Sequence, residues 1–202
     1  VAPAPPPRRP RVQAAAVVAE LSAILAATAN ALRQHDIGLA DDALTRARAS
    51  EHALDELRGL SAEGIAVVRL SPFRRRHLPA VQAIVDLVEP LDRAIRNIRV
   101  LVRRASVALS EGEDVPAAYV DLISSLAVVT AEIAGRLSNR ELAEGSRDAL
   151  TAIMRASSVM ETHQGLSAEV IRAQVRSAVL DLLMLTGLRY DEARDLVRAA
   201  GR

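Results

Sequence analysis

The chain has 202 residues, of which 50% are hydrophobic, 25% are charged and only 1% are aromatic. It contains no cysteine and no lysine, so the Lys+Arg total of 26 is all arginine, against 25 acidic residues and a net charge of +1. This composition excludes disulfides, thiolate metal sites and lysine nucleophiles. It also lacks the cationic excess and the stacking aromatics of nucleic-acid binders, so we predict no nucleic-acid partner.

The N-terminal part divides into a leader and a first helix. Residues 1–11 are rich in proline and arginine, and we expect an extended linker. Residues 12–35 carry apolar side chains at helical spacing. Between Val12 and Leu32 the only charged residue is Glu20, a length close to that of a membrane span. The many alanines and the scattered polar residues favour a buried central helix instead.

A second helix is predicted over 41–70, starting at an aspartate, a residue type that caps helices. The strongly basic segment 72–79 follows it, with Arg74, Arg75 and Arg76 between apolar neighbours. Such a segment suits contact with an anionic membrane surface. An ordinary solvated loop has the same composition, and both interpretations stay open.

The third predicted helix follows Pro79 and carries an unbroken apolar stripe with steps of four and three residues. The spacing predicts packing nearly parallel or antiparallel to neighbouring helices, as in a bundle, and Pro90 predicts a kink. The stripe consists of Ile84, Val88, Leu91, Ile95, Ile98, Val102, Ala105 and Leu109.

Loop residues divide the rest of the chain into four more helices, and no strand pattern or internal repeat competes. We therefore predict an all-α fold, a bundle of six to seven helices with long antiparallel helices, as a single domain over residues 12–202. The remaining helices are expected from Pro116, over 140–161, from a cap at Ser167 to Gly187, and over 191–200.

Motifs for enzymatic chemistry are absent from the sequence. It has no GxSxG, SxxK or GxGxxG pattern, and its histidines are not at metal-ligand spacing. We predict no enzyme, no metal site and no cofactor. The histidines are His35, His52, His77 and His163.

Arginines gather on the third helix beside the apolar stripe. Two of them follow a carboxylate by four residues, in the pairs Glu89/Arg93 and Asp92/Arg96, which favours ion pairs along the helix. The cluster as a whole suits bidentate binding of a ligand carboxylate. Pairing with acidic residues of a neighbouring helix explains it equally well. The candidate ligand-binding residues are Arg93, Arg96, Arg99 and Arg103.

Two segments resemble a known family. The strings RLSPFRRRH at 69–77 and LDRAIRNIRVLVRRA at 91–105 are similar to the C-terminal soluble region of actinobacterial FUSC-type proteins, the fusaric acid resistance or aromatic acid exporter family. The closing segment 182–197 looks similar as well. In that family a block of membrane helices precedes a cytosolic helical domain.

The resemblance implies a cytosolic domain of an inner-membrane exporter-like protein for small aromatic or amphipathic organic acids. Its expected partners are its own transmembrane domain, joined through the 1–11 leader, an anionic membrane surface, and a small organic acid. Its expected location is the cytoplasmic face of the inner membrane, with basic residues on that side. Its role would be substrate capture, gating or assembly.

Two other functions stay open. The heptad-like stripe suits a structural or oligomerising module that forms a homo-oligomer. A free-standing, ligand-responsive helical regulator without a transport role fits the same composition. If the domain binds an acid, we expect an apolar groove between helices for the body and one of the clustered arginines for the carboxylate.

Overall fold

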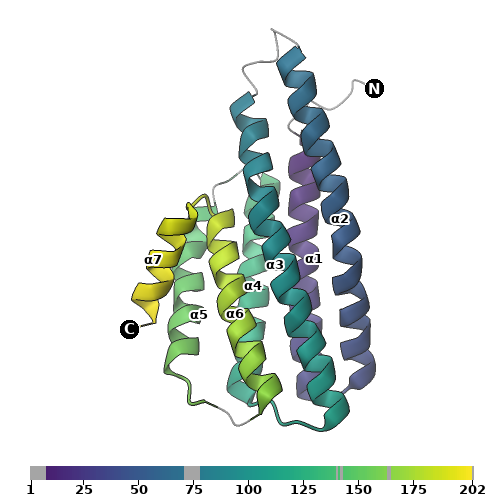
Figure 1. The fold of residues 1–202 in the computed structure, drawn as a ribbon, viewed down its shortest axis with the longest axis vertical. Coiled ribbons are helices and arrows are strands. Elements are labelled where there is room, and N and C mark those ends of the chain that lie inside the picture. The colour runs from purple at the N-terminus through teal and green to yellow at the C-terminus, as the bar shows by residue number, and fades with distance from the viewer. Residues whose placement is uncertain (1–7, 71–77, 140, 142, 163–164, 202) are drawn as a thin grey trace.

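The computed structural model describes residues 8–70, 78–139, 141, 143–162 and 165–201. Over this part of the chain the fold is an all-α bundle without strands, which confirms the predicted fold class (Figure 1). The helices are α1 Arg8–Gln34, α2 Ile37–Leu70, α3 Leu78–Glu111, α4 Ala117–Asn139, the short 3-10 helix η2 Ala143–Ser146, α5 Arg147–Val159, α6 Leu166–Leu185 and α7 Tyr190–Ala200.

The nearly uncharged sequence of α1 predicts a buried central helix, but one face of α1 stays exposed; that face includes Ala16, Ala19, Ala23 and Ala26. Helix α1 packs most extensively against α4, and also against α2 and α3, while α6 packs on the other side of α3. Its core side chains include Leu21, Ile24 and Leu25, all buried. Burial of each such side chain stabilises the fold by about 1.5–3 kcal/mol.

Two helices, Pro10–Gln34 and Ala117–Asn139, are long and apolar enough to cross a membrane. In the bundle they pack against each other, and about half of the most apolar stretch of each is buried (50% and 56%). Core helices of a bundle have the same composition, because apolar residues are needed wherever a helix is surrounded by others.

The first two helices start earlier than expected. Helix α1 begins at Arg8, so the end of the 1–11 leader is helical; Pro10 lies in the first turn, where its missing N–H costs no hydrogen bond. Helix α2 begins at Ile37 because Asp36, not Asp41, caps it by accepting a hydrogen bond from the N–H of Leu39 (3.0 Å). Asp36 directly follows His35, whose left-handed backbone conformation (φ 54°) ends α1.

The C-terminal helix ends depend on contacts that are distant in sequence. The predicted 140–161 helix is split into η2 and α5. Helix α6 starts at Leu166, and the carboxylate of Glu113 accepts a hydrogen bond from the N–H of Ser167 (3.1 Å). Ser167 therefore does not have its predicted capping position. Gly187 does terminate α6, with a left-handed φ of 91°.

Helices α2 and α3 are the longest, and they project together past the other helices at one end of the bundle (Figure 1). The α3 helix continues through Pro90. Most of its apolar stripe, from Ile84 to Ala105, is buried against α2, α6 and α1 of the same chain. The stripe is therefore used inside the bundle, and its projecting part faces only α2.

Candidate functional site

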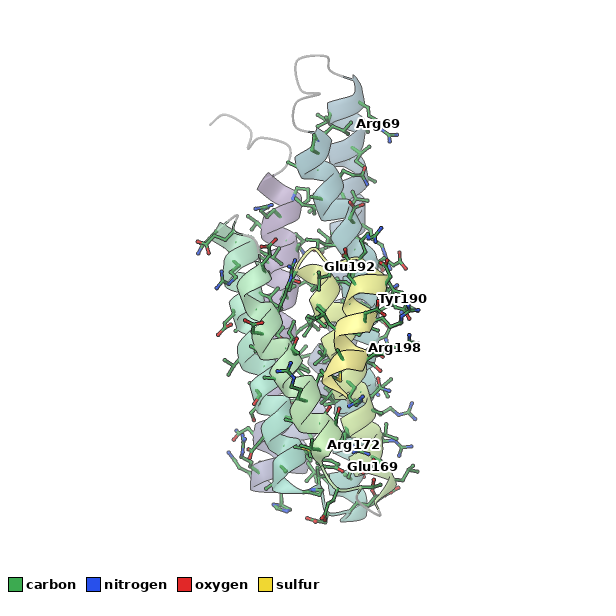
Figure 2. The ribbon with its side chains drawn as sticks, turned by 90° about the vertical axis from the view of Figure 1, so that its left-hand side faces the viewer. Arg69, Glu169, Arg172, Tyr190, Glu192 and Arg198 are labelled. Atoms are coloured by element: carbon green, nitrogen blue, oxygen red, sulfur yellow. The ribbon has the colours of Figure 1, made fainter. Side chains whose placement is uncertain are left out.

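A hollow of about 440 Å³ lies between α2 and α3, which we name the α2–α3 groove. Its walls are mainly apolar and its rim is charged, the usual character of small-molecule sites. The projecting ends of the two helices lie beyond it, where Arg69 marks the tip of α2 (Figure 2). The groove is lined by Arg58, Ser61, Ala62, Ile65, Val85, Val88, Glu89 and Asp92.

Ser61 is one of the residues that line the groove. The residue is only 3% exposed, and its Oγ is shielded from solvent and has no hydrogen-bond partner among the described residues. A buried hydroxyl without a partner costs about 1–3 kcal/mol.

Sequence reasoning missed Ser61, although a signal exists. On α2 the buried positions Leu54, Leu57, Ser61 and Val68 follow helical spacing, so a serine stands where the pattern calls for a large apolar residue. The smaller side chain also leaves room, which a leucine would fill. A polar residue inside an apolar stripe is therefore the sequence feature that indicates this site.

Arg58, on α2, lies at the rim of the groove. Its guanidinium donates to Asp55 one turn earlier (2.8 Å) and lies 3.3 Å from Asp92 across on α3. Asp55 is 67% exposed, and exposed pairs of this kind are worth only about 0–1 kcal/mol. The two contacts give the Arg58 guanidinium a defined position, and its weak contact with the exposed Asp55 can be exchanged for a ligand carboxylate.

The arginine cluster on α3 does not line the groove. Arg93 reaches α6, where its Nε donates to Asp181 (3.1 Å), and its Nη1 donates to Glu89 on α3 itself (2.6 Å). The side chain of Asp181 is 5% exposed and also accepts from Asn97 (2.7 Å). Burial raises the pKa of Asp181, and the hydrogen bonds from Arg93 and Asn97 oppose that rise.

The other three candidate arginines have different surroundings. Arg96 pairs with Asp92, so both i,i+4 pairs predicted on this helix are present. Arg99 pairs with Glu51 of α2. Arg103 is exposed and makes no ion pair with a described residue. The observed contacts of Arg93 and Arg99 are those of the alternative in which neighbouring helices neutralise the cluster.

The predicted membrane-contact residues, Arg74, Arg75 and Arg76, lie outside the described residues. Within the described part, no group of three or more histidine, aspartate or glutamate side chains is arranged to hold a metal ion. The α2–α3 groove is a candidate site because it combines apolar walls with charged groups at its rim.

The fold and the groove define the class of the protein as an all-α bundle with a small-molecule-sized hollow between two projecting helices. Comparison with known protein families gives no match, and neither does comparison with solved structures. The chain is similar to a protein of Corynebacterium glutamicum that is itself described as uncharacterized. The two are 29% identical over 196 residues, which cover 91% of this chain and 49% of the relative. The chain thus spans about half the length of that relative.

Proposed function

We propose that this bundle is the cytosolic domain of an inner-membrane exporter-like protein and captures small aromatic or amphipathic organic acids in the α2–α3 groove. The observation that carries the proposal is an apolar hollow of about 440 Å³ with the Arg58 guanidinium at its rim. An amphipathic acid matches both parts, since its apolar body fills the walls and its carboxylate meets the polar groups.

The rim charges are compatible with an acid. Glu89 and Asp92 would repel a carboxylate if they were unpaired, but each is bound to the arginine four residues later on α3. Arg58 has five N–H groups, and its contacts to Asp55 and Asp92 leave others for a ligand. Release of the exposed Asp55 would cost little.

The resemblance to FUSC-type exporters supports the membrane part of the proposal. The string 69–77 begins in α2 and continues into the segment between α2 and α3, and the string 91–105 lies within α3, so the resembling segments belong to the same part of the chain as the groove.

Titration calorimetry with benzoate, salicylate and octanoate tests the capture step. We expect saturable heat for at least one acid, and at least tenfold weaker binding by Arg58→Gln. The matched control is Arg103→Gln, because Arg103 is an exposed α3 arginine outside the groove and forms no ion pair with a described residue. Its affinity should equal that of the wild type.

Two results would overturn the capture proposal. One is the absence of heat for every acid. The other is a loss of affinity in Arg103→Gln with none in Arg58→Gln, which would place binding on the α3 arginine cluster.

Membrane association is tested separately, by fractionation of cells that express the natural gene product. We expect the gene product in the inner-membrane fraction. Recovery in the supernatant after high-speed centrifugation would contradict the exporter proposal and favour the ligand-responsive regulator, for which the same groove would serve. A structural or oligomerising module is less well supported, because most of the heptad-like stripe of α3 is buried within the chain.

A further inference from the structure

A second hollow, of about 400 Å³, lies between the end of α5, helix α6 and the end of α7. In contrast to the α2–α3 groove, most of its lining is polar. Glu169 and Arg172, which belong to it, lie at the opposite end of the molecule from Arg69 (Figure 2). The hollow is lined by Ser157, Ser158, Glu169, Arg172, Ala173, Arg176 and Gly201.

One of its two arginines is fully engaged in holding the fold. Arg172 donates to Glu169 through Nε (3.1 Å) and Nη2 (2.5 Å), and through Nη1 to the carbonyl of Met160 at the end of α5 (3.3 Å). Its guanidinium also lies over the ring of Tyr119, 5.9 Å from the centroid. The charge of Arg172 is therefore neutralised by Glu169.

The second arginine, Arg176, is placed one turn further along α6 and has no carboxylate partner among the described residues. Its Nη1 donates to the hydroxyls of Ser157 (3.0 Å) and Ser158 (2.6 Å). Both hydroxyls donate in turn to the carbonyl of Met154 (2.7 and 2.9 Å), which fixes their orientation. The described groups of the hollow thus carry one positive charge in excess: two arginines against one glutamate.

The orientation of Arg176 leaves one side of its guanidinium for a ligand. Nε and Nη2 donate to no described residue, and these two groups form the edge that binds a carboxylate or phosphate through two parallel hydrogen bonds. Gly201 borders this edge. A Cβ at Gly201 would lie 3.5 Å from Arg176 Nη2 and 3.5 Å from Ser158 Oγ, so the missing side chain contributes to the open space.

We propose that this hollow binds a small oxyanion, a carboxylate or a phosphate, on the Nε/Nη2 edge of Arg176. The C-terminal carbonyls of α5 and Glu169 disfavour an anion in general. Arg172 donates hydrogen bonds to Glu169 and to the carbonyl of Met160, and it neutralises their negative charge. The remaining positive charge is that of Arg176, which meets the ligand. The site is independent of the α2–α3 groove and of the function proposed for it.

The test is a titration of the folded chain with inorganic phosphate and, separately, with acetate, followed by the amide NMR signals of Gly201 and Ala173. We expect saturable shifts with at least one of the two anions, and the stronger of the two identifies the ligand chemistry. Arg176→Gln should bind at least tenfold more weakly. Arg198→Gln is the matched control, an exposed arginine on α7 (Figure 2), and should bind as the wild type does.

Gly201→Val is a second variant for the case that Arg176→Gln unfolds. Gly201 has a φ of −93°, which valine adopts, and the added side chain occupies the hollow, so we expect at least fivefold weaker binding in a folded protein. The proposal is overturned if neither anion gives saturable shifts at these amides, or if folded Arg176→Gln or Gly201→Val binds as tightly as the wild type.

Discussion

Replacement of Arg93 by methionine is the sharpest test of how α3 is held against α6. The substitution leaves the Asp181 carboxylate, 5% exposed, with Asn97 as its remaining partner. Removal of one member of a buried ion pair costs about 3–5 kcal/mol, because the other charge stays buried and unpaired. Arg93 itself is 34% exposed, so water replaces part of the interaction, and we expect about 3 kcal/mol, the lower end of that range.

Urea unfolding of wild type and Arg93→Met measures this loss, and the melting temperature should fall by about 6–12 °C for a chain of this size. The control is Glu89→Gln, which removes the 80%-exposed partner of the same arginine and should cost less than about 1 kcal/mol. The double variant Arg93→Met/Asp181→Leu should recover most of the stability, since an apolar pair replaces the buried charges. The reasoning is refuted if Arg93→Met costs no more than Glu89→Gln.

Three further predictions concern pH and helix ends. Because burial raises the pKa of Asp181, ionisation of this group opposes folding. Wild type should therefore gain stability relative to Asp181→Asn as the pH falls from neutral through the pKa of the folded carboxyl. Urea unfolding at several pH values measures this gain. Hydrogen bonding by Ser167 lowers the pKa of Glu113. The stability of the wild type should therefore exceed that of Glu113→Gln at neutral pH, and this difference should disappear as the pH falls below the ordinary range of a glutamate. A difference that persists in acid contradicts this cap. Gly187→Ala should destabilise by about 1–2 kcal/mol, because alanine is strained at a φ of 91°; an unchanged melting temperature would contradict that geometry.

The architecture was predictable from the sequence because it depends on local patterns. Helical spacing marked the apolar face of each long helix. The end of α6 at Gly187 was equally local, since only the glycine's backbone freedom was needed. Helix starts were predicted less well: the sequence analysis placed the cap of α2 at Asp41, whereas Asp36 caps it.

The candidate site was less predictable because partners far apart in sequence decide it. Arg93 and Arg99 are paired with Asp181 and Glu51, which lie on other helices and more than 40 residues away in the sequence. Ser61 is significant only because nothing in the described fold satisfies its hydroxyl, which is a tertiary property. The same holds for Arg176, whose excess charge becomes evident only once Glu169 is assigned to Arg172.

The most direct test of the central proposal is the location of a bound acid in the α2–α3 groove by methyl NMR. Octanoate is titrated into protein labelled at isoleucine and valine methyl groups. The proposal predicts saturable shifts for Ile65, Val85 and Val88, with Ile133 in the α4 core unchanged, and it predicts that Arg58→Gln weakens binding. Saturable shifts confined to methyl groups outside the groove, or none at any octanoate concentration, would contradict it.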